Sequence, residues 1–162
     1  MIVVSNTSPL INLARIGHLV LLQHIFGKIL IPAAVWQEAV MDGEGQPGAM
    51  EICQAGWIER LTVTNRQLVH SLGQELDPGE AEAISLAVEI KADWLLMDER
   101  LGRQTARHFD LGTIGLIGIL KVAKQRGEIA ALRPLLEQLR DIAGFRISQA
   151  LFEQALQDVG EL

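Results

Sequence analysis

Acidic and amide side chains that could bind a divalent metal ion occur at several separated points of the chain. Asn6 and Asp98 each follow a short apolar run, and Glu99 is next to Asp98. Glu80 lies 18 residues before Asp98, and Glu38 lies farther upstream. Carboxylate and amide oxygens are the ligands that Mg²⁺ and Mn²⁺ prefer. A metal ion held in this way can activate water for hydrolysis of a phosphodiester.

Each of these residues also has a plain structural interpretation. Asn6 is a common type of turn residue, and Asp98 could cap the helix that follows it. Glu38 lies in a segment with helical character, where ordinary placement at the surface is the alternative.

The structural alternative is strongest for Glu80. The sequence Asp77-Pro78-Gly79-Glu80 has the pattern of a capping box, with Asp77 at the N-cap and Pro78 at the first helical position. Glu82 lies about 200° around the same helix from Glu80, so the two are not expected in one site.

Arg100, Arg103 and Arg107 recur at spacings of three and four and share one helix face just beyond Asp98. They could bind RNA phosphates beside an acidic site, or they could form a solvated surface. Lys121, Lys124 and Arg126 could extend the basic set.

Short apolar segments predict the strands that must position these residues. They cover residues 1–4, 29–31, 57–63, 94–97 and 113–114.

Helical periodicity and helix-start signals predict the intervening helices. The first is expected over residues 10–16, with Ser8 as N-cap and Pro9 at the first position. The others are expected over residues 19–26, 32–40, 77–92, 100–108, 117–126, 130–142 and 148–158, and residues 42–48 read as a loop.

Strands that alternate with helices predict an α/β fold, with a small central parallel sheet between two helical layers. Active sites of such sheets lie at the carboxyl ends of the strands, where Asn6 and Asp98 are expected. No linker divides the chain, so residues 1–162 are expected to form one domain. The amphipathic segment over about residues 130–162 is expected to pack on the core or on a partner.

Composition limits the classes of function. Hydrophobic residues make up 49% of the 162 residues, enough for a substantial core. The formal net charge of −6 argues against a broad basic surface for nucleic acid, although basic residues can cluster locally. Cys53 is the only cysteine, which excludes an internal disulfide and fits a reducing compartment. With no signal peptide or membrane span visible, we expect a cytoplasmic protein.

The order of several segments resembles the PIN-domain nucleases, and within them a group related to the VapC-type toxins of toxin–antitoxin pairs. The resemblance covers most of residues 2–129. It is carried by VVSNTSPLINLARIG, IPAAVWQEAV, LDPGEAEAISLAVE, ADWLLMDERLGRQTA and GTIGLIGILKVAKQRGEI.

The resemblance implies a three-layer α/β/α fold and a site for Mg²⁺ or Mn²⁺ that cleaves RNA. It places Asn6 where an aspartate is usual and Glu38, Glu80 and Asp98 on the three other acidic positions. Glu99 is implied as an additional acid, and Thr7 or Ser8 as a polar helper.

Asn6 is a departure from the usual pattern, because it removes one negative charge from the implied site. An amide oxygen still binds Mg²⁺ or a metal-bound water, but less strongly than a carboxylate. The resemblance further implies an RNA substrate, a small cognate antitoxin and a homodimer.

Two other functions fit parts of the sequence. A non-catalytic module that binds RNA or an antitoxin is favoured by Asn6 and disfavoured by the remaining acids. A metal-dependent phosphatase on a similar sheet is disfavoured, because no DxD sequence follows the first strand.

Overall fold

Five short strands form a parallel sheet in the computed structural model, which describes all 162 residues. The strand order is β3-β2-β1-β4-β5, and every neighbouring pair is parallel. Val4 of the central strand pairs with Leu30 on one side and Leu95 on the other. The strands are β1 (Val3–Ser5), β2 (Ile29–Pro32), β3 (Ile58–Leu61), β4 (Trp94–Leu96) and β5 (Thr113–Ile114).

All five strands occur where apolar runs predict them, with ends that differ by up to two residues. β1 and β2 are buried along their whole length, which is typical of parallel strands covered on both faces. The α/β class with a small central parallel sheet is confirmed.

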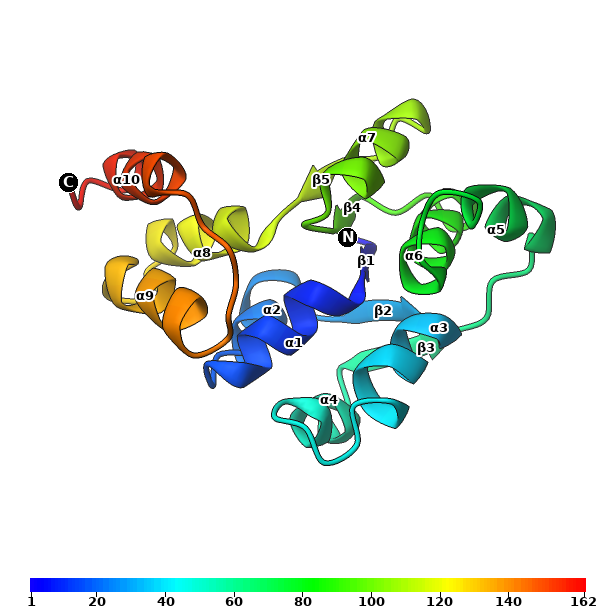
Figure 1. Cartoon of the computed structure of the whole chain (residues 1–162), viewed down its shortest axis with the longest axis horizontal. Helices are drawn as coiled ribbons and strands as arrows, with labels where there is room; N and C mark the ends of the chain where they lie inside the picture. Colours follow the sequence, from blue (N-terminus) through cyan, green and yellow to red (C-terminus); the bar gives the residue numbers. More distant parts are fainter.

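Helices connect the strands and cover both faces of the sheet, which gives the expected three layers (Figure 1). They are α1 (Thr7–Arg15), α2 (Val20–Phe26), α3 (Ala33–Trp36), η1 (a π-helical turn, Gln37–Met41), α4 (Ala49–Gln54), α5 (Arg66–Leu72), α6 (Pro78–Glu89), α7 (Arg100–His108), α8 (Leu116–Gln125), α9 (Arg133–Asp141) and α10 (Gln149–Asp158). None of them combines the length and the apolar composition needed to cross a lipid bilayer.

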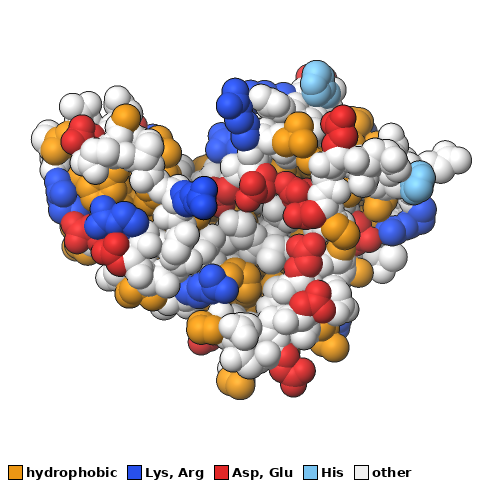
Figure 2. All heavy atoms as spheres, viewed as in Figure 1, with side chains coloured by type: hydrophobic (Ala, Val, Ile, Leu, Met, Phe, Trp, Pro, Cys, Tyr) orange, Lys and Arg blue, Asp and Glu red, His pale blue; other side chains and the backbone are white.

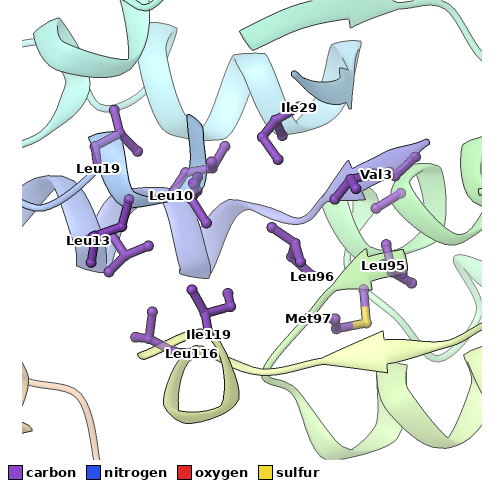
Figure 3. Packing of buried hydrophobic residues seen from close by; sticks show 14 of the residues in the cluster. Val3, Leu10, Leu13, Leu19, Ile29, Leu95, Leu96, Met97, Leu116 and Ile119 are labelled. Carbon is purple, nitrogen blue, oxygen red and sulfur yellow. The ribbon is translucent and has the colours of Figure 1, made fainter. Parts of the chain in front are cut away.

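The helical layers meet in one core. α6 packs against β1, β2 and β4, while α5 and α7 lie beside α6. Figure 3 shows Leu10 and Leu13 of α1 facing side chains of β4 and α8. The same cluster of 39 buried residues includes leucines of α9 and Phe152 of α10, so the C-terminal segment packs on the core.

The start of α1 differs from the sequence prediction. The helix begins at Thr7, and the N-cap position belongs to Asn6, whose backbone is extended. Ser8 was the expected N-cap, but its hydroxyl instead donates to Asp98 Oδ2 at 3.3 Å. Tertiary contact with Asp98, which follows β4, therefore overrides the local capping signal, and Pro9 lies inside the first turn.

Candidate active site

Asn6 and Asp98 lie at the point in the sheet where the order of the strands reverses. From β1, the chain adds β2 and β3 on one side and then crosses to β4 and β5 on the other. Asn6 directly follows β1, and its backbone N–H donates to Leu96 O of β4 at 2.9 Å. Asp98 follows β4 by two residues. Ligands of open α/β sheets bind at this kind of crossover, beyond the carboxyl ends of the strands.

The side chain of Asn6 is buried, although its amide oxygen makes no hydrogen bond. The residue is 4% exposed, and its Oδ1 has no hydrogen-bond partner. An asparagine at an N-cap normally accepts a bond from the first turn of its helix, but Asn6 makes no such bond. An unsatisfied buried oxygen costs about 1–3 kcal/mol, and a cation would remove that cost.

Glu38 is held by two groups from other elements. Thr7 Oγ1 donates to Oε1 at 2.6 Å, and Gly79 N–H donates to Oε2 at 3.0 Å. A Cβ on Gly79 would lie 2.8 Å from Oε2, so the carboxylate occupies space that only glycine leaves open. Burial raises the pKa of Glu38, and the bond from Thr7 partly offsets this. Glu38 lies in the π-helical turn η1, a feature often found at functional sites.

Asp98 contacts the starts of two helices. Leu116 N–H, the first of α8, donates to Oδ1 at 2.7 Å, while Ser8 of α1 contacts Oδ2. Asp98 does not cap α7, where Glu99 holds the N-cap position. Burial raises the pKa of Asp98, whereas the nearby charge of Arg103 lowers it.

Consecutive residues at the start of α1 thus hold two distant acids. Thr7 contacts Glu38, and Ser8 contacts Asp98. This arrangement brings both acids to the end of β1.

Glu80 forms the capping box that the sequence predicts. Its Oε1 accepts from Asp77 N–H at 3.1 Å, and Asp77 Oδ1 accepts from Glu80 N–H at 2.8 Å. Oε2 makes no hydrogen bond within the protein. Burial raises the pKa of Glu80 to about 7, and the charges of Asp77 and Glu99 contribute to the increase. Glu82 points elsewhere, as predicted, and pairs with Arg66 at 3.0 Å.

A hollow of about 410 Å³ lies over the end of β1, and we call it the acidic hollow. Its lining residues include Asn6, Thr7, Ser8, Arg15, Glu38, Asp77 and Glu99. Asp98 lines two adjoining hollows, and Glu80 lines none of the three. No three Asp, Glu, His or Cys side chains are grouped closely enough to hold one metal ion by themselves.

Acidic side chains form a band across the hollowed face of the molecule, with several basic side chains above it and to its left (Figure 2). Of the three arginines on α7, Arg103 lines a hollow together with Asp98, while Arg100 and Arg107 are exposed and line none of the three hollows.

The three other basic residues that could extend this set are bound to other groups. Lys121 lines the hollow of Arg103 but pairs with Asp158, and Lys124 pairs with Glu161. Arg126 donates to Ile25 O.

Three charged residues beside the acids were not predicted as site residues. Asp77 was recognised only as a helix cap, but it also lines the acidic hollow. Arg15 and Arg146 line hollows together with Glu99, and no motif marks either residue. Arg146 comes from the connection between α9 and α10, so only the tertiary path of the chain reveals it.

The parallel sheet between helical layers, with acids at its crossover, has the architecture of a nuclease-type α/β/α fold. The chain belongs to a PIN-domain family: the family model DUF3368, described as a PIN domain, matches residues 2–161. PIN domains are generally nucleases. Neither the curated proteins nor the solved structures that were compared gave a match to the chain.

Proposed function

We propose that this PIN domain is a divalent-metal-dependent endoribonuclease that hydrolyses RNA phosphodiesters with Mg²⁺ or Mn²⁺. The observation that carries the proposal is the unsatisfied Oδ1 of Asn6, buried at the end of β1, where the next two residues, Thr7 and Ser8, contact Glu38 and Asp98. A buried oxygen without a donor, close to acids whose burial disfavours their charge, is suited to a cation.

The donor set fits Mg²⁺ or Mn²⁺. All candidate ligands are oxygens, and Mg²⁺ commonly binds one or two carboxylates while it retains several waters. Asn6, Glu38 and Asp98 would hold the ion directly or through water, and Glu80 would contribute Oε2, which its capping box leaves free. When bound, the ion would lower the pKa of a water and neutralise charge on the phosphate.

The protein's own side chains have separate tasks in this proposal. Glu38 and Asp98, fixed by Thr7 and Ser8, orient the reacting water and accept hydrogen bonds from it. Arg103 binds the RNA phosphate, since it lines the same hollow as Asp98. Glu99 and Asp77 keep the hollow negative, which favours a doubly charged ion. Arg100 and Arg107 are exposed, so they attract RNA only through long-range electrostatic interactions that solvent and salt weaken.

The biological role that we propose is that of the toxin in a type II toxin–antitoxin pair. A small cognate antitoxin would restrain the nuclease, and two copies of the chain would form a homodimer. Both partners are proposed from the likeness of the sequence to VapC-type toxins.

One observation favours a second candidate, a non-catalytic PIN module that binds RNA or an antitoxin. Asn6 is neutral, and the bonds from Gly79 and Leu116 already engage the carboxylates of Glu38 and Asp98. These contacts would allow the acids to serve only the fold.

Cleavage of a single-stranded RNA by the purified protein, with Mn²⁺ or with EDTA, separates the two candidates. We expect cleavage that requires Mn²⁺, and we expect Asp98→Asn to lower its rate by about 100-fold or more. Asp141→Asn is the matched control, because Asp141 is exposed on α9 and pairs with Arg140. RNA binding without cleavage would support the module, and full activity of Asp98→Asn would exclude the proposed site.

A further inference from the structure

The acidic hollow continues into two neighbouring hollows. The second hollow shares Ser8, Asn12, Arg15 and Glu99 with the acidic hollow. The third hollow shares Asp98, Phe145 and Arg146 with the second. Together they form one trough, which runs past the carboxyl ends of β1 and β4 to the start of α8. A nucleic-acid strand in this trough would pass Asn6, Glu38 and Asp98.

One wall of the trough is the connection between α9 and α10. Residues 143–146 line the second hollow, and Phe145 and Arg146 also line the third. Phe145 N–H donates to Leu139 O at 2.8 Å, which fixes the segment against the end of α9. Arg15 of α1 reaches the same segment, with Nη1 3.5 Å from Ala143 O. The wall is therefore held in place by contacts with two helices.

Arg15 and Arg146, which both line the second hollow, are not bound to any carboxylate. Arg146 is exposed and makes no hydrogen bond, ion pair or cation–π contact. Arg15 makes only the long bond to Ala143. By contrast, Arg66, Lys121 and Arg140 each pair with an acidic side chain. Arg15 and Arg146 thus keep their guanidinium groups free, although the protein has a net charge of −6.

We infer that Arg15 and Arg146 form a binding subsite for successive backbone phosphates of RNA, supplied in part by the C-terminal segment. The inference deepens the proposed function and rests on it. A guanidinium binds a phosphate through two parallel hydrogen bonds. Phe145, which lines the same hollow as the two arginines, adds an aromatic surface on which an unpaired base can stack.

This subsite explains how an acidic protein binds a polyanion. The acids of the hollow repel RNA, and the unpaired guanidinium groups of Arg15 and Arg146 restore local attraction. Because side chains of α9 and α10 pack in the common core, the connection between these helices brings Arg146 to the same two hollows as Asp98.

RNA binding tests the subsite without requiring any cleavage. Anisotropy of a short fluorescein-labelled oligouridine is measured with Asp98→Asn protein, which lacks cleavage under the proposed function and carries one negative charge less. Adding Arg146→Gln or Arg15→Gln is expected to weaken binding roughly tenfold each. Each change should also lower the slope of log affinity against log salt concentration by about 0.7, the value for one lost phosphate contact.

Arg140→Gln is the matched control. Arg140 lies on α9 near the same segment and stacks on Phe152, but it lines none of the three hollows. If Arg140→Gln weakens binding as much as Arg146→Gln, the effect comes from packing of α9 and α10, and the subsite is wrong. Unchanged affinity and salt slope in Arg15→Gln and Arg146→Gln would also overturn it. Failure of the wild type to cleave RNA would reject the nuclease and leave a positive binding result standing.

Discussion

At the scale of single residues, the site contains buried carboxyl groups that have no cationic partner. Glu80 is 7% exposed and Asp98 is largely enclosed, yet neither has a cation within ion-pair distance. Desolvation therefore raises the pKa of both carboxyl groups. Raised carboxyl pKa values at the end of a sheet are typical of sites that bind a cation or transfer a proton.

The raised pKa of Glu80 predicts how stability depends on pH. Between about pH 4.5 and pH 7, the folded protein keeps the Glu80 proton and the unfolded chain has lost it. The free energy of unfolding therefore falls as pH rises through this range, on the order of 2–3 kcal/mol in total. Urea unfolding in EDTA at a series of pH values should show this decrease in the wild type and a smaller one in Glu80→Gln. Glu44→Gln, in an exposed loop, is the control; identical pH profiles for the wild type and Glu80→Gln would contradict the prediction.

At the scale of elements, the helix starts position the functional groups. α1 contributes Thr7 and Ser8, the first turn of α6 contributes Gly79 N–H, and α8 contributes Leu116 N–H. Partial positive charge at helix N-termini stabilises the carboxylates that these groups contact. Gly79 leaves room for the Glu38 carboxylate, and Gly115, the N-cap residue of α8, leaves room for the side chains of Arg103 and Asp98.

Gly115→Ala is predicted to disturb catalysis through this close approach. A Cβ at this position would lie 2.8 Å from Arg103 Nη1 and 3.0 Å from Asp98 Oδ1, so one of these side chains must move. We expect roughly a tenfold loss of kcat/KM for RNA, with a change in unfolding free energy of about 1 kcal/mol or less. Gly56→Ala is the matched control, since no atom lies within 4 Å of the added methyl group. If Gly115→Ala cleaves RNA with the kcat/KM of the wild type, Arg103 and Asp98 need not keep this geometry.

The sequence predicts elements well where one local signal dominates. The range of α7 agrees at both ends, and the capping box at Asp77 marks the start of α6. α4 and α5 were not predicted, because α4 buries only two residues and α5 buries none, so neither helix shows a clear apolar stripe. α2 is as short as α5 but buries three residues, and it was predicted.

Candidate site residues were predictable where they follow a strand, as Asn6 and Asp98 do. Contacts made by folding were not predictable. Ser8 looks like a helix cap, but its hydroxyl contacts Asp98. Arg146 reaches the trough only because α9 and α10 pack beside α8 and α1, and no local pattern contains that information.

At the scale of the whole molecule, topology joins residues that are far apart in sequence. The crossover between β1 and β4 places Asn6 beside Asp98, and α1 connects both to Glu38. The connection between α9 and α10, together with Leu151 of α10, lines one end of the trough. Both helices lie at one end of the molecule (Figure 1). The central claim is that these three residues share one metal ion, although they come from three separate segments.

Calorimetric titration with Mn²⁺ tests this claim most directly. For the wild type, we predict one saturable site that Glu38→Gln and Asp98→Asn each weaken by roughly tenfold or more, because a charged ligand is replaced by a neutral one. Asn6→Asp should tighten the same site by roughly tenfold, since a carboxylate replaces the amide oxygen. Absence of saturable binding, or an affinity that all three substitutions leave unchanged, would contradict the shared metal site.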